Sequence, residues 1–76
     1  MDEFTILNAI DHLEFLMNLG REHYEAGMQQ TAKDYFKSAQ FISALLLEVE
    51  TGVDVKEFAA QILSDAVSIL ATTEFD

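Results

Sequence analysis

The sequence contains no cysteine and no proline, and only 3 of its 76 residues are glycine. Without cysteine, the chain cannot form a disulfide scaffold, a thiolate metal site or a cysteine nucleophile. The lack of proline and the scarcity of glycine favour long uninterrupted helices over many short strands and turns. Basic residues are also scarce, 4 against 14 acidic ones, and the net charge of −10 opposes direct binding to nucleic acid or to an anionic membrane.

Hydrophobic residues, in contrast, make up 50% of the sequence, which excludes an acidic disordered tail. A chain of this length predicts a single domain, residues 1–76, with a thin core, because a domain this small buries only about 60% of the surface of its unfolded chain. The first residues carry no basic targeting segment, and no apolar run approaches the roughly 20 residues of a membrane span. We therefore expect a soluble, intracellular protein of the cytoplasm.

Two glycines, Gly27 and Gly52, divide the sequence into three segments with helical periodicity, at about 5–26, 29–50 and 55–72. Gly27 is expected to end the first helix, because glycine adopts the left-handed conformation of a helix C-terminus without strain. The short glycine-containing turns place consecutive helices side by side in opposite directions. The sequence therefore predicts an all-α fold, an antiparallel up-down-up three-helix bundle.

Each segment has an apolar stripe that we expect to face the core. In the first segment it comprises Ile6, Ile10, Leu13, Leu16, Met17, Gly20 and Tyr24. In the second it comprises Ala32, Tyr35, Phe36, Ala39, Ile42, Leu46 and Val49. In the third it comprises Val55, Phe58, Ala59, Ile62, Leu63, Ala66, Ile69 and Leu70. Phe41 and Leu45 are predicted to widen the second stripe, because the middle helix of a bundle must contact two neighbours.

The ends of the third segment also carry local signals. Asp54 and Glu57 predict an acidic variant of the capping box, in which each side chain accepts a backbone N–H of the first turn. The last residues, 74–76, are expected to fray.

Small and large residues alternate across the first turn in a recognisable pattern. It comprises Leu19-Gly20, His23-Tyr24, Gly27, Ala32, Phe36 and Ala39. This pattern resembles one tetratricopeptide repeat, in which small residues let two helices approach closely and large residues fill the gaps. Over its whole length the chain resembles the MIT domain (microtubule-interacting and trafficking), a three-helix bundle whose first hairpin is similar to such a repeat. Both families bind peptides or helices, so the resemblance implies a protein-binding role.

No residue pattern indicates catalysis or a bound cofactor. His12 and His23, the only histidines, lie about 16 Å apart along one helix, too far to share a metal ion. The chain also lacks a glycine-rich phosphate loop. We predict no enzyme activity, no catalytic residue, no metal site and no cofactor.

A second apolar stripe lies on the first helix, opposite its inward face. At about 100° per residue, Phe15 and Leu19 belong to this stripe, and Phe4 projects the same way if the helix reaches it. A small bundle offers such a stripe nothing to pack on, so we expect a partner protein or a second copy of the chain to cover it. The alternative is a rotated or broken helix that carries Phe15 and Leu19 into the core.

The outer side of the same helix also carries a band of carboxylates, with Arg21 as the nearby cation. The band comprises Asp11, Glu14, Glu22 and Glu25. Spaced carboxylates on a rigid helix can imitate a run of DNA phosphates, as in small viral and mobile-element proteins that occupy nucleic-acid-binding proteins. The alternative is a solvated face whose charge keeps the protein soluble.

The sequence thus predicts a small acidic, non-enzymatic protein-protein interaction module that acts by helix docking, as an adaptor, an inhibitor or a homodimer. The first alternative is a nucleic-acid mimic, of viral or mobile-element origin, that inhibits a basic nucleic-acid-binding protein. The second is an MIT-like trafficking adaptor that holds an amphipathic peptide in a groove between two helices.

Overall fold

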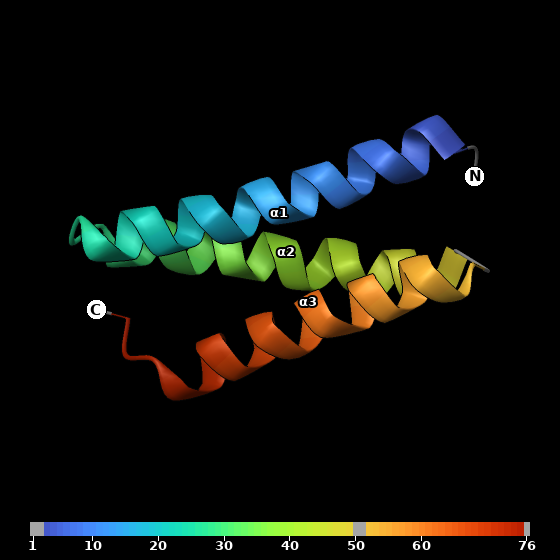
Figure 1. Cartoon of the computed structure of the whole chain (residues 1–76). Coiled ribbons are helices and arrows are strands. Elements are labelled where there is room, and N and C mark those ends of the chain that lie inside the picture. Colours follow the sequence, from blue (N-terminus) through green and yellow to red (C-terminus); the bar gives the residue numbers. More distant parts are fainter. Residues whose placement is uncertain (1–2, 50–51, 76) are drawn as a thin grey trace.

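Three helices account for nearly all of the part of the chain that the structure, a computed structural model, describes, namely residues 3–49 and 52–75. They are α1 (Glu3–Glu25), α2 (Gln29–Val49) and α3 (Val53–Thr72). Consecutive helices run in opposite directions, and the described ranges contain no strand (Figure 1). The predicted all-α three-helix bundle is confirmed. The predicted end of the second helix, at Glu50, lies outside the described residues.

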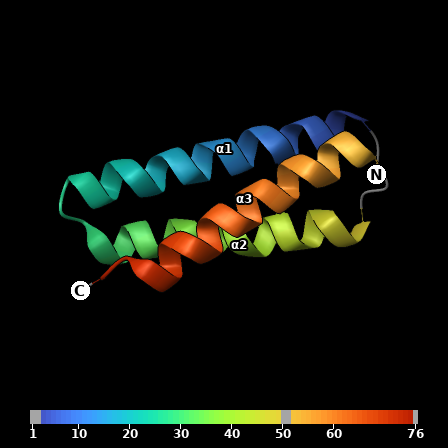
Figure 2. The ribbon, with the colours of Figure 1, turned by 60° about the horizontal axis from the view of Figure 1, so that its bottom comes forward.

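The middle helix, α2, packs along both of its neighbours, whereas α1 and α3 contact each other little. Figure 2 shows α3 crossing the α1–α2 hairpin obliquely. As a result, α1 and α3 diverge towards the end of the bundle where both of them finish (Figure 1). Both flanking helices therefore cover adjacent sides of α2 and leave its remaining side open.

The core is built from side chains of all three helices, most of them small or medium in size. It comprises Leu13, Leu16, Met17, Ala32, Phe36, Ala39, Leu46, Ala59 and Ala66. All nine belong to the predicted inward stripes. Ser43 is also fully buried, which the sequence did not predict, and its hydroxyl donates to the Ala39 carbonyl oxygen at 2.8 Å.

The prediction that Phe41 and Leu45 widen the core stripe of α2 is wrong. Both side chains are exposed, Phe41 to 65%. The reason is the position of the flanking helices. Phe41 lies about 180° around α2 from the buried Ala32, and α1 and α3 both contact the side of α2 that carries Ala32.

The first turn is closed as the sequence predicts. Gly27 has a φ of +84°, in the left-handed region that favours glycine. The Gly27 N–H donates to the Tyr24 carbonyl oxygen at 3.1 Å, and the Met28 N–H donates to that of His23 at 2.8 Å. These two bonds form a Schellman motif, which satisfies two carbonyl groups in the last turn of α1.

The start of α3 differs from its prediction. Gly52 is the N-cap residue and no side chain caps the helix, so the capping box of Asp54 and Glu57 does not form. Because the helix begins earlier than predicted, at Val53, Asp54 falls inside the first turn. Its carboxylate can still interact favourably with the positive end of the helix dipole.

Within the described ranges, no helix combines the length and the apolar character that a membrane crossing requires.

Candidate protein interaction surface

The seam between α1 and α2 shows which way the second apolar stripe points. The rings of His23 on α1 and Tyr35 on α2 meet across this seam, with centroids 5.1 Å apart. On α1, Tyr24 lies on one side of His23 and faces the groove towards α3, whereas Phe15 and Leu19 lie on its other side. The stripe therefore faces away from α3.

The same reasoning shows which exposed residues of α2 also lie on the side away from α3. Phe36 lines the hollow between α1 and α3. Going around α2, Phe36 lies on one side of Tyr35, and Phe41 and Leu45 lie on the other side. We call the surface formed by Phe15, Leu19, Phe41 and Leu45 the outer face. The sequence analysis missed the contribution of α2, although the position of Phe41 opposite Ala32 on the helix was a usable signal.

Two large aromatic side chains dominate the outer face. Phe15 is 57% exposed and Phe41 is 65% exposed, whereas Leu19 is half-buried. The ring of His12 stacks beside that of Phe15 at a centroid distance of 6.5 Å. On α2, a shallow hollow is lined by Lys37, Ser38, Phe41 and Ile42. The alternative in which Phe15 enters the core is wrong.

Phe4 was predicted to project the same way as Phe15 if the helix reached it. α1 begins at Glu3, so Phe4 is helical and lies within about 20° of Phe15 around the helix. Its side chain is 74% exposed and lies about 16 Å from Phe15 along α1. The exposed Leu7 lies one turn from Phe4, near the start of the helix.

The four predicted carboxylates, Asp11, Glu14, Glu22 and Glu25, are all exposed. They fall within an arc of about 80° along α1, next to the side that carries Phe15. Arg21 interrupts the band, and its guanidinium donates to the Asn18 side-chain oxygen at 3.3 Å. The acidic band therefore borders the outer face along one helix.

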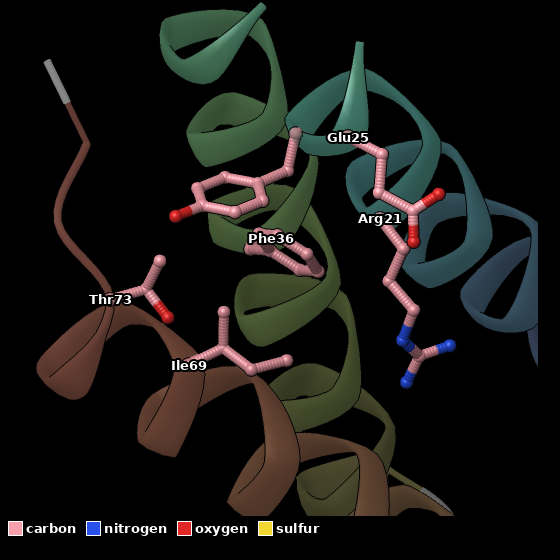
Figure 3. A pocket seen from close by; sticks show the side chains of 6 residues that line it. Arg21, Glu25, Phe36, Ile69 and Thr73 are labelled. Atoms are coloured by element: carbon pink, nitrogen blue, oxygen red, sulfur yellow. The ribbon is translucent and has the colours of Figure 1, made fainter. Parts of the chain in front are cut away.

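A second hollow, of about 180 Å³, lies between the diverging ends of α1 and α3. Its lining comprises Arg21, Tyr24, Glu25, Phe36, Ile69 and Thr73. Figure 3 shows Phe36 of α2 between Arg21 and Glu25 from α1 on one side and Ile69 and Thr73 from the α3 end on the other. We call this hollow the α1–α3 groove.

The two histidines have separate surroundings. His23 is half-buried, and its Nδ1 donates to the Leu19 carbonyl oxygen at 2.7 Å, whereas His12 is exposed beside Phe15. Across residues 3–49 and 52–75, no group of three or more His, Asp or Glu side chains is placed to hold a metal ion.

No family model, no curated protein and no solved structure matches this chain. The resemblance to the tetratricopeptide repeat and to the MIT domain stays a prediction from the sequence pattern.

Proposed function

We propose that this chain is a non-enzymatic protein interaction module that docks a helix of a partner protein, or of a second copy, on its outer face. The observation that carries the proposal is the placement of Phe15 and Phe41. These residues come from different helices, both are more than half exposed, and both face away from α3. Folding leaves one large ring of α1 and one of α2 exposed, each on the side of its helix that turns away from α3.

The size of this surface supports the proposal energetically. Complete burial of a phenylalanine side chain contributes about 1.5–3 kcal/mol, and aromatic residues dominate the centres of protein interfaces. Leu19 and Leu45 extend the apolar area beside the two rings. A helix that lies along the seam between α1 and α2 reaches residues of both helices, which is the geometry of helix-in-groove recognition.

Affinity capture tests the proposal directly. The immobilised chain is incubated with host lysate and compared with the Phe15→Ser and Phe41→Ser variants. Val53→Ser serves as the matched control, because Val53 is a 69% exposed apolar residue that begins α3, away from the outer face. We expect a captured protein, or a dimer by light scattering, that both phenylalanine variants lose and the control retains. A strictly monomeric chain that captures nothing contradicts the proposal.

The acidic band supports a second candidate, a nucleic-acid mimic that occupies a basic partner. It predicts capture that weakens steeply as the salt concentration rises, because contacts between exposed charges are screened. It also predicts that a variant without these four carboxylates captures nothing. This variant combines Asp11→Asn, Glu14→Gln, Glu22→Gln and Glu25→Gln. If capture does not weaken as the salt concentration rises and persists in this variant, the partner binds the outer face instead.

A further inference from the structure

Phe75 follows the end of α3 and turns back onto the bundle. Its ring meets that of Tyr24 edge-on, with centroids 5.8 Å apart, and lies 6.2 Å from that of Phe36. Both partners also line the α1–α3 groove. Phe75 is half-buried and packs against the core, although the sequence predicted that residues 74–76 fray.

We propose that the aromatic surface of Tyr24 and Phe36, at the edge of the α1–α3 groove, is a second binding site, for a peptide segment that presents an aromatic side chain between basic residues, and that Phe75 is its resting occupant. The site is separate from the outer face, so the proposal does not rest on the proposed function. The chain itself shows which side chain this surface accepts. Tyr24 and Phe36 already hold one phenyl ring.

The α1–α3 groove beside this surface is open. Its cavity of about 180 Å³ lies between α1 and α3, and Phe75 is not one of its lining residues. Ile69 and Thr73 form its α3 wall (Figure 3). Glu74 and Phe75 lie beyond the last helical turn, so no helix holds the ring in position. A partner can displace the ring without unfolding a helix.

Charge favours a basic partner over the chain's own segment. Phe75 stands between Glu74 and Asp76 in the sequence, and it docks on a protein whose net charge is −10. The charged residues that line the adjoining groove, Glu25 and Arg21, offset each other, so the preference comes from the net charge of the whole protein. The resting occupant carries charges of the same sign as that net charge, whereas lysine or arginine beside a partner's aromatic residue carries the opposite sign.

Titration of the ¹⁵N-labelled full chain with a capped pentapeptide, one Phe between two pairs of Lys, tests the proposal. Amide shifts are expected at Tyr24, Ile69 and Thr73, which line the groove. Phe75→Ala is expected to raise the affinity, by about tenfold if the resting ring occupies the groove nine-tenths of the time. A matched peptide with Ala in place of Phe separates ring recognition from charge alone.

Two further variants locate the site. Tyr24→Ser is expected to weaken peptide binding, whereas Phe15→Ser is expected to leave it unchanged, because Phe15 lies on the outer face. Equal affinity of the wild type and Phe75→Ala, equal affinity for the Phe and Ala peptides, or shifts confined to the outer face overturn the proposal. The proposal is also overturned if the wild type is a dimer and the Phe75→Ala variant is a monomer, because Phe75 would then bind a second copy of the chain.

Discussion

The ring of Phe36 lies directly against the backbone of Gly20. A Cβ atom added to Gly20 would stand 2.7 Å from both Cε1 and Cζ of Phe36, closer than real Cβ atoms approach carbon. Both residues are buried, so this contact determines how closely α1 approaches α2. Glycine is therefore needed in the middle of α1 for a packing reason, despite its low helix propensity.

Gly20→Ala is expected to lower the free energy of unfolding by about 1–3 kcal/mol, as overpacked core substitutions do. The gain in helix propensity, about 1 kcal/mol, offsets part of this loss. Urea denaturation monitored by circular dichroism measures the change. If Gly20→Ala is more stable than the wild type, the Phe36 ring does not restrict the size of the residue at position 20.

Phe36→Leu tests whether the ring causes that loss. Leucine fills less of the space beside Gly20, so Gly20→Ala is expected to be less harmful in the Phe36→Leu background than in the wild type. Residues in direct contact typically show a coupling of about 0.5–3 kcal/mol in such a double-mutant cycle. Strict additivity of the two substitutions would show that the Phe36 ring moves away at no cost.

Gly27→Ala is expected to destabilise the chain for a different reason. No atom lies within 4 Å of the position of an added Cβ, so the cost comes from the φ of +84° alone. A residue with a Cβ pays about 1–2 kcal/mol in that region. Gly27→Asn is expected to lose less, because asparagine tolerates the left-handed conformation. Equal melting temperatures for wild type and Gly27→Ala contradict this account.

Ser43→Ala is expected to be nearly neutral, within about 0.5 kcal/mol, although Ser43 is fully buried. Its hydroxyl donates to the carbonyl oxygens of Ala39 and Gln40, at 2.8 and 3.0 Å, within its own helix. Alanine removes the donor and leaves carbonyl groups that the α2 ladder already satisfies, and alanine has the higher helix propensity. A loss above about 1.5 kcal/mol in urea denaturation would show that the hydroxyl stabilises the core.

Helix number, turn positions and most core residues could be predicted from the sequence, because they depend on local chemistry. Apolar spacing marks Leu13, Met17 and Ala39, and Gly27 ends α1 through its own backbone freedom. Ser43 escaped prediction because a serine that bonds within its own helix behaves as a small apolar residue.

The candidate surface was only half predictable. The pattern of α1 shows that Phe15 points outward, and the position of Phe41 opposite Ala32 indicates the same for Phe41, but the apolar residues of α2 do not by themselves show how wide a side its neighbours cover. α1 and α3 lie on adjacent sides of α2, which leaves Phe41 and Leu45 exposed. The docking of Phe75 on Tyr24 depends on the divergence of α1 and α3, a tertiary feature that no local spacing records.

The two exposed phenylalanines are expected to contribute little to folding. Phe15→Ser and Phe41→Ser should each change the free energy of unfolding by no more than about 0.5 kcal/mol, as surface substitutions do. Phe36→Ala, in the core, is expected to lose about 3–5 kcal/mol. Thermal melts of the three variants check the difference. A large loss for Phe15→Ser would assign that ring a structural role.

The affinity of the captured partner for the outer face tests the central claim most directly. Calorimetric titration compares the wild type, Phe15→Ser, Phe41→Ser and the control Val53→Ser, all of which are expected to remain folded. We predict that each phenylalanine variant weakens binding at least about tenfold, equivalent to about 1.4 kcal/mol, and that Val53→Ser binds as the wild type does. Equal affinities of all four proteins would contradict the assignment of the outer face as the binding surface.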